Sequence, residues 1–102
     1  MGRFVKVAKT SEIPEGRSKV FTLEEKRVLV VNFQGSFYAV EDRCSHLGYS
    51  LYLGNVEGKV ITCGFHYAKF DITTGEVLAP PAEKPLKTFQ VAVKNSDIWV
   101  EL

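Results

Sequence analysis

Cys44-Ser45-His46 and Cys63-Gly64-Phe65-His66 are two short stretches that contain every cysteine and every histidine of the 102-residue chain. Each stretch offers one thiol and one imidazole, and sixteen residues separate His46 from Cys63. Chance placement would not gather all the soft ligands of a chain into two neighbouring mixed pairs. The pattern therefore predicts a metal centre between two loops, with Cys44, His46, Cys63 and His66 as its ligands.

The spacing of these four residues bears on the kind of metal centre. Zinc accepts Cys and His, but its common sites place two Cys close together and two His close together. Here each arm, C-x-H and C-x-x-H, carries one residue of each type. This alternation suits a [2Fe-2S] cluster with thiolates on one iron and imidazoles on the other. A structural zinc site in an interaction module is the alternative, and it predicts a colourless protein.

Further motifs follow the second arm. They are His66-Tyr67-Ala68-Lys69-Phe70-Asp71, Thr74-Gly75-Glu76 and Ala79-Pro80-Pro81-Ala82. Together with the two arms, they resemble the Rieske-type [2Fe-2S] ferredoxins of low potential, which are associated with oxygenases or are soluble proteins of archaea and bacteria. The resemblance covers nearly the full chain. It implies one Rieske-type [2Fe-2S] cluster per chain, with Cys44 and Cys63 on one iron and His46 and His66 on the other.

Period-two alternation and β-branched runs recur along the chain, and glycine and proline interrupt them at short intervals. No segment shows a clear helical period. Gln34-Gly35 is expected to be a hairpin turn, 54–59 a longer turn, and Trp99 a core residue. The expected strands are 4–8, 19–23, 27–33, 36–40, 51–53, 60–62, 70–72, 76–78, 87–93 and 98–102. The chain is therefore predicted to be all-β and antiparallel, as a sandwich or partly open barrel.

The length of the chain predicts one domain, residues 1–102. The Rieske-type resemblance implies a division within it. Strands before Val40 and after Leu86 would form a base, and the stretch from about 42 to 78 would be a smaller cluster-binding β subdomain inserted into that base.

Charge and hydropathy exclude several classes of partner. Lys and Arg number 13 against 12 Asp and Glu, so the chain lacks the basic excess of a protein that binds nucleic acid or acidic membranes. No apolar run approaches the length of a membrane span, and the first residues lack the apolar core of a signal peptide. We therefore expect no nucleic acid and no membrane as partners, and a cytoplasmic location.

The rest of the sequence gives no sign of catalysis. It has no spare histidine for a mononuclear iron site, no glycine-rich nucleotide motif and no nucleophile–base pair that uses a free histidine. The expected role is an electron-transfer protein and not an enzyme. The resemblance implies a flavin-dependent or other reductase as the electron donor and a terminal oxygenase or other redox enzyme as the acceptor. The alternative is a small Rieske-like subunit of a larger redox enzyme of the nitrite-reductase type; a large apolar patch outside the cluster tip, or stable co-purification with a bigger chain, would favour it.

Two positions after the second arm bear on the reduction potential. High-potential Rieske proteins have a serine and a tyrosine where this chain has Ala68 and Phe70, and those hydroxyls donate hydrogen bonds to the cluster sulfurs. Neither Ala68 nor Phe70 has a side-chain donor. The resemblance therefore implies a potential at the low end of the Rieske range, which runs from about −150 to +300 mV.

Overall fold

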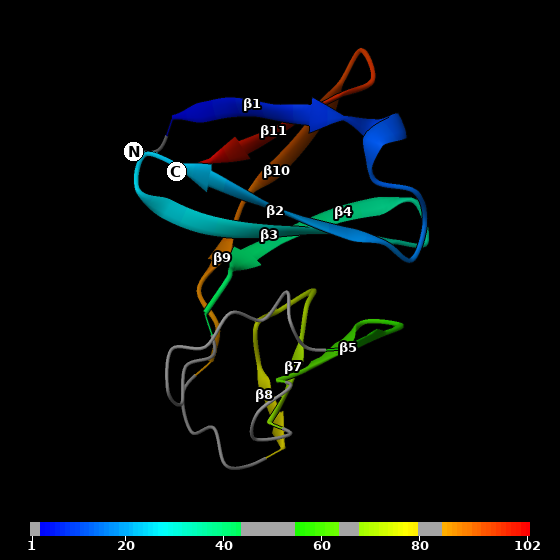
Figure 1. The fold of residues 1–102 in the computed structure, drawn as a ribbon, viewed down its shortest axis with the longest axis vertical. Helices are drawn as coiled ribbons and strands as arrows, with labels where there is room; N and C mark the ends of the chain where they lie inside the picture. Colours follow the sequence, from blue (N-terminus) through cyan, green and yellow to red (C-terminus); the bar gives the residue numbers. More distant parts are fainter. Residues whose placement is uncertain (1–2, 44–54, 64–67, 80–84) are drawn as a thin grey trace.

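The computed structural model describes residues 3–43, 55–63, 68–79 and 85–102 (Figure 1). Within them the fold is all-β, with three antiparallel sheets and one 3-10 turn, Thr10–Glu12, so the predicted fold class is confirmed. Sheet A has the order β1-β11-β10, sheet B the order β2-β3-β4-β9, and sheet C the order β5-β6-β7-β8. The strands are β1 Phe4–Lys9, β2 Ser18–Leu23, β3 Lys26–Phe33, β4 Ser36–Glu41, β5 Asn55–Glu57, β6 Val60–Thr62, β7 Lys69–Asp71, β8 Val77–Ala79, β9 Thr88–Phe89, β10 Val91–Lys94 and β11 Asp97–Glu101.

Strand β3 has side chains in two hydrophobic cores. Val28 and Val30 pack in a core shared with sheet A, whereas Leu29 and Val31 pack in a second core shared with sheet C. All four residues are at most 1% exposed. Successive side chains of a strand point to opposite faces. The unbroken apolar run of β3 therefore reflects burial on both faces.

The hairpin between β3 and β4 turns at Gln34–Gly35, as the sequence predicts. Gln34 and Gly35 have φ values of 55° and 86°. Positive φ at both central residues is the geometry of a two-residue type I′ hairpin loop. The buried side chain of Asn32 holds this turn, because its amide donates to the carbonyl oxygen of Ile13 and its side-chain oxygen accepts from the Gly35 N–H, both at 2.9 Å.

The predicted single strand over 87–93 is wrong, because this stretch is divided between two sheets. Strand β9 pairs with β4 in sheet B, and β10 pairs with β11 in sheet A. Gln90 lies between them, and its carbonyl oxygen accepts a hydrogen bond from the Glu101 N–H at 2.9 Å. The chain changes sheets at Gln90, and a local alternation pattern does not reveal such a change of partner.

The predicted turn over 54–59 is wrong in part. Its residues Asn55–Glu57 form β5, in which Val56 lies opposite Ile61 of β6. Among the described residues of this stretch, 55–59, the turn is confined to Gly58–Lys59, with Gly58 at a φ of 62°. Val56 packs against the core shared by sheets B and C. This tertiary contact outweighs the turn-forming composition of the segment.

Smaller differences concern single positions. Trp99 is half-buried and is not a core residue, because Ile98 and Val100 take the inward positions of β11. Strands β7 and β8 are each displaced by one residue from their predicted ranges. The predicted strand over 51–53 lies outside the described residues.

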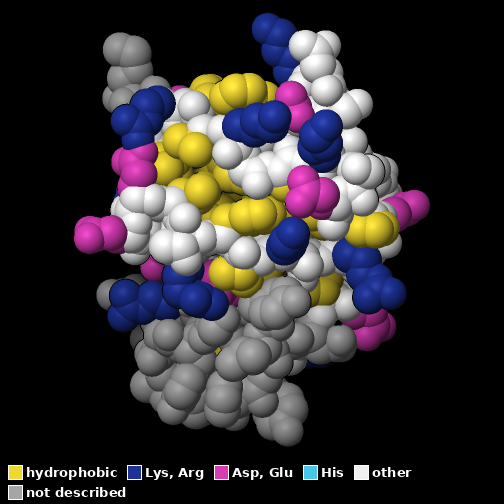
Figure 2. Space-filling model, turned by 45° about the horizontal axis from the view of Figure 1, so that its top comes forward, with side chains coloured by type: hydrophobic (Ala, Val, Ile, Leu, Met, Phe, Trp, Pro, Cys, Tyr) yellow, Lys and Arg dark blue, Asp and Glu magenta, His cyan; other side chains and the backbone are white. Residues whose placement is uncertain are grey.

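The surface carries both signs of charge. Figure 2 shows basic and acidic side chains interspersed over the visible face of the described residues, with hydrophobic side chains between them. This visible face of the described residues therefore presents no broad positive field of the sort that nucleic-acid binding uses. No helix in the described part of the chain is long and apolar enough to cross a membrane.

Candidate metal centre

One end of sheet C collects the strand ends to which both predicted ligand arms attach. The strand register places Asn55, Thr62, Lys69 and Ala79 next to one another across the four strands. In the sequence, the first arm leads into β5, the second arm connects β6 to β7, and the Pro80-Pro81 segment leaves β8. Chain continuity therefore ties the second arm and the start of the proline segment to this end of sheet C, and the chain coming from the first arm enters sheet C here at Asn55.

Cys63 is the one predicted ligand among the described residues. It is a free cysteine with 0% exposure, and it directly follows β6. Its backbone N–H donates a 2.8 Å hydrogen bond to the carbonyl oxygen of Ala68, which closes the base of the second arm. Burial keeps water away from the sulfur, and solvent exposure is one of the factors that set the potential of an iron–sulfur centre.

Cys63 belongs to the hydrophobic core that joins sheets B and C. Ala68 and Phe70 lie in the same core at 0% exposure, so both positions that bear on the potential face apolar neighbours. Full burial of a phenylalanine side chain stabilises a fold by about 1.5–3 kcal/mol. The buried members of this core are Leu29, Val31, Val40, Ile61, Cys63, Ala68, Phe70, Ile72 and Leu86.

Three of the predicted ligands, Cys44, His46 and His66, lie outside the described residues, as do Pro80 and Pro81. Among the residues that the structure describes, no group of three or more His, Cys, Asp or Glu could hold a metal ion. The donor set of the chain, two thiols and two imidazoles, matches that of a Rieske-type cluster. The buried Cys63 fits the role of a thiolate ligand in that set.

The end of sheet C away from the arms is organised by Asp71. Its carboxylate accepts hydrogen bonds from the N–H and the hydroxyl of Thr73, at 2.8 and 2.6 Å, and lies 3.4 Å from Lys59 Nζ. Burial raises the pKa of this carboxyl, but the Thr73 hydrogen bonds and the Lys59 charge outweigh burial, so its pKa lies below the ordinary value. An aspartate two residues before a threonine is a turn-forming pattern, so the sequence could have indicated the turn at Asp71–Thr73. No pattern in the neighbouring residues indicates the ion pair between Asp71 and Lys59.

Gly75 links sheet C to the segment that returns to sheet B. Its N–H donates to the carbonyl oxygen of Asp71 at 2.6 Å, and its own carbonyl oxygen accepts from the Leu86 N–H at 2.8 Å. Its φ is +82°, and a Cβ atom built there would lie 2.5 Å from the Leu86 carbonyl oxygen. Both the backbone conformation and the close approach require glycine.

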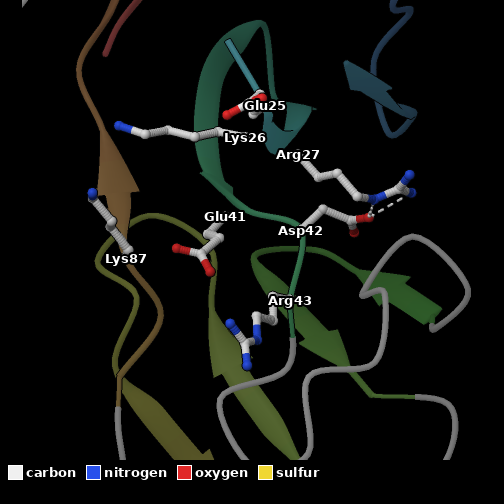
Figure 3. A pocket seen from close by; sticks show the side chains of 7 residues that line it. All are labelled: Glu25, Lys26, Arg27, Glu41, Asp42, Arg43 and Lys87. Atoms are coloured by element: carbon white, nitrogen blue, oxygen red, sulfur yellow. Dashed lines mark hydrogen bonds and ion pairs between the residues drawn. The ribbon is translucent and has the colours of Figure 1, made fainter. Parts of the chain in front are cut away.

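A hollow of about 370 Å³, lined by residues with charged side chains, lies beside the start of the first arm (Figure 3). Within it, the guanidinium group of Arg27 on β3 contacts the carboxylate of Asp42, just after β4. Sequence reasoning missed this contact because the two partners are fifteen positions apart in the chain. The hollow is lined by the basic residues Lys26, Arg27, Arg43 and Lys87 and the acidic residues Glu25, Glu41 and Asp42.

Comparison with known proteins identifies the family. A family model described as the Rieske [2Fe-2S] domain matches residues 3–90. The biphenyl dioxygenase ferredoxin subunit of Pseudomonas sp. (strain KKS102) is 32% identical over 99 residues, which cover 96% of this chain and 91% of that protein.

Solved structures agree with this match. The ferredoxin of carbazole 1,9a-dioxygenase from Nocardioides aromaticivorans IC177 superposes with a TM-score of 0.90 and 30% identity, over 95% of each chain. A chain from the complex of reduced oxygenase and oxidised ferredoxin in carbazole 1,9a-dioxygenase has a TM-score of 0.90 and 33% identity, over 95% of this chain and 91% of that one.

Residues 3–90, which match the family model, include both predicted arms and every strand of sheets B and C. The cofactor is therefore a Rieske-type [2Fe-2S] cluster, and the alternative interpretation as a structural zinc site is set aside. On its sequence match, its fold and its donor set, the chain belongs to the Rieske [2Fe-2S] family.

Proposed function

We propose that this chain is a one-electron carrier, and not an enzyme, which receives electrons from a flavin-dependent or other reductase and delivers them to a terminal oxygenase. Its relatives support this role, since one is the ferredoxin subunit of a dioxygenase and another is found in a complex with an oxygenase. The observation that supports the proposal is the pairing of Thr62 with Lys69, which holds the two ends of the second arm side by side, with the buried Cys63 at its start.

We propose Cys44 and Cys63 as the ligands of one iron, and His46 and His66 as the ligands of the other. When bound, the cluster supplies a centre that takes up and releases a single electron. The buried Cys63 holds its sulfur away from water. Neutral imidazoles in place of two thiolates raise the potential above that of a four-cysteine cluster, whereas Ala68 and Phe70 offer no side-chain hydrogen bonds that would raise it further.

We also propose that residues 1–102 are a single domain in which about 42–78 form an inserted cluster-binding subdomain. Sheet C, with strands between Asn55 and Ala79, provides the framework of that part. A cytoplasmic location fits a chain whose two cysteines both serve as ligands, because exported proteins commonly use their cysteines in disulfides.

A large apolar patch outside the cluster tip would favour the alternative role as a subunit of a larger enzyme. In the described part of the chain, the large apolar side chains that are exposed are Phe4, Leu78 and Val93, at 44%, 49% and 51%. They lie on three different strands, β1, β8 and β10. The described surface therefore gives this alternative no support.

A redox titration followed by electron transfer tests the proposal. The purified protein should show a reversible one-electron couple and a Rieske-type absorption spectrum that bleaches with dithionite. The reduced protein, mixed rapidly with the oxidised terminal oxygenase of a biphenyl dioxygenase system, should lose its electron in a single concentration-dependent phase. Absence of a reversible one-electron couple would contradict the carrier role.

A further inference from the structure

Arg27 and Asp42 meet where the chain leaves sheet B for the first arm (Figure 3). Nε and Nη2 of Arg27 lie 3.2 and 3.0 Å from Oδ2 of Asp42. The Asp42 side chain is 0% exposed, whereas that of Arg27 is 55% exposed. The Asp42 N–H also donates to the carbonyl oxygen of Arg27 at 2.9 Å. The two residues are therefore connected through both their main chains and their side chains.

Asp42 lies at the centre of a tight turn. The N–H of Arg43 donates to the carbonyl oxygen of Glu41 at 2.8 Å, and this hydrogen bond closes a three-residue turn directly at the end of β4. Cys44 follows Asp42 by two residues, and two residues of chain span at most about 7 Å. The direction in which the chain enters the first arm is thus set at the residue that Arg27 contacts.

We propose that Arg27 is a positioning residue for the cluster: by holding Asp42, it fixes the point from which the first ligand arm starts. This inference rests on the proposed function, with Cys44 as a ligand. A buried carboxylate is unfavourable unless it is paired and hydrogen-bonded. The contact therefore constrains the chain more strongly than an ion pair between two exposed side chains, which contributes little.

The same contact sets the charge beside the first arm. The guanidinium group of Arg27 neutralises the carboxylate of Asp42, which is within two residues of Cys44. Removing the guanidinium group takes a positive charge away from beside the ligand arm, and the loss of a nearby positive charge disfavours the addition of an electron. Loss of Arg27 should therefore lower the midpoint potential as well as move the arm.

Three variants of the holoprotein test the role of Arg27: Arg27→Gln, Arg27→Lys and the control Arg17→Gln. Arg17 is exposed and precedes Ser18, which pairs with Val31, whereas Arg27 pairs with Thr22 at the other end of β2 and β3. The control therefore makes the same change of charge far along the strands from Asp42.

We expect Arg27→Gln to lower the electron affinity about threefold, which is roughly 28 mV for one electron, and to change the g values of the reduced protein. Arg27→Lys keeps the charge but loses the planar two-nitrogen contact. It should keep the wild-type midpoint and give g values between those of the wild type and Arg27→Gln. Arg17→Gln should match the wild type in both measurements.

Wild-type midpoint and g values in Arg27→Gln would overturn the inference, even if that variant melted at a lower temperature. Equal shifts in Arg17→Gln and Arg27→Gln would also overturn it, because they would reflect net charge alone. Loss of the cluster from an Arg27→Gln protein that keeps its β-sheet circular dichroism would support the inference.

If Arg27→Gln does not fold, the g values of Arg27→Lys test the positioning role. Wild-type g values in Arg27→Lys would overturn it. A wild-type protein without a reducible cluster would refute the proposed function instead. The two failures are therefore distinguishable.

Discussion

Replacing Gly75 with alanine tests the connection between sheet C and the segment that returns to sheet B. The added Cβ would lie 2.5 Å from the carbonyl oxygen of Leu86 and 3.0 Å from the methyl carbon of Thr88. The φ of +82° is also unfavourable for any residue with a Cβ atom. Alanine would therefore strain its own backbone and push the returning segment away.

The loss of stability in Gly75→Ala has three contributions: backbone strain, a weakened hydrogen bond and overpacking. The left-handed backbone costs about 1–2 kcal/mol for a non-glycine residue. Displacement of Leu86 weakens its N–H hydrogen bond to the Gly75 carbonyl oxygen, which is 2.8 Å long in the native structure and contributes about 0.5–1.5 kcal/mol. Overpacking adds about 1–3 kcal/mol. The free energy of unfolding should therefore fall by about 2.5–6.5 kcal/mol, which lowers the melting temperature by at least about 10 °C at roughly 4–8 °C per kcal/mol.

Gly35→Ala is a matched control for the steric part. Gly35 has a φ of +86°, but a Cβ atom there would meet no atom within 4 Å. Gly35→Ala should therefore lower the free energy of unfolding only by the strain of the left-handed backbone, about 1–2 kcal/mol. Thermal and urea unfolding of both variants, followed by circular dichroism, measures the difference. Equal destabilisation by Gly75→Ala and Gly35→Ala would refute the reasoning, because the contact with Leu86 would then contribute nothing.

Three further predictions concern sheet C. Thr73→Val removes the hydroxyl that donates to the Asp71 carboxylate at 2.6 Å, so it should lower the free energy of unfolding, measured in urea, by about 1–2 kcal/mol. The control Thr74→Val loses only an exposed hydroxyl that accepts from the Glu76 N–H at 3.2 Å, and it should lower this free energy clearly less. Equal losses in the two variants would contradict this prediction. Because the folded-state pKa of Asp71 is below its ordinary value of 3.8, its contribution to stability is complete above that value and disappears as pH falls through the folded pKa. Stability measured below about pH 4 should therefore fall more steeply in the wild type than in Asp71→Asn, and parallel curves would argue against this role. Ala68→Ser places a hydroxyl donor after the second arm and should raise the midpoint by roughly tens of millivolts in a redox titration, so an unchanged or lower midpoint would count against it.

Local sequence signals predicted the elements whose structure depends on neighbouring residues. The Gln34-Gly35 turn and the strands on either side of it are confirmed, because a type I′ turn depends on the two residues that form it. The apolar run of β3 indicated a buried strand, although only the tertiary structure shows that its two faces serve different cores.

Elements that depend on distant partners could not be predicted. The division between β9 and β10 at Gln90 follows from which sheet each half joins, and β5 exists because Val56 reaches a core built mainly by sheets B and C. The alternation in β11 indicated a strand but not which of its faces points inward, and so Trp99 was assigned to the core.

The candidate site shows the same contrast. The residue types and spacing of the two arms, together with the motifs that follow the second arm, were sufficient to predict the cluster and its family, because these signals are local in the sequence. The side-chain contacts at the start of the first arm, Arg27 with Asp42, and at the far end of sheet C, Lys59 with Asp71, join residues that are fifteen and twelve positions apart. Only the folded structure brings these partners together.

Pulsed electron-spin spectroscopy of the dithionite-reduced protein, grown with ¹⁵N-labelled histidine, tests the proposed ligand set most directly. Two ¹⁵N couplings of the size expected for metal-bound nitrogen should be present in the wild type, and one should disappear in either His46→Cys or His66→Cys. A reduced protein that lacks both couplings, or whose couplings persist unchanged in both variants, would contradict a cluster held by Cys44, His46, Cys63 and His66.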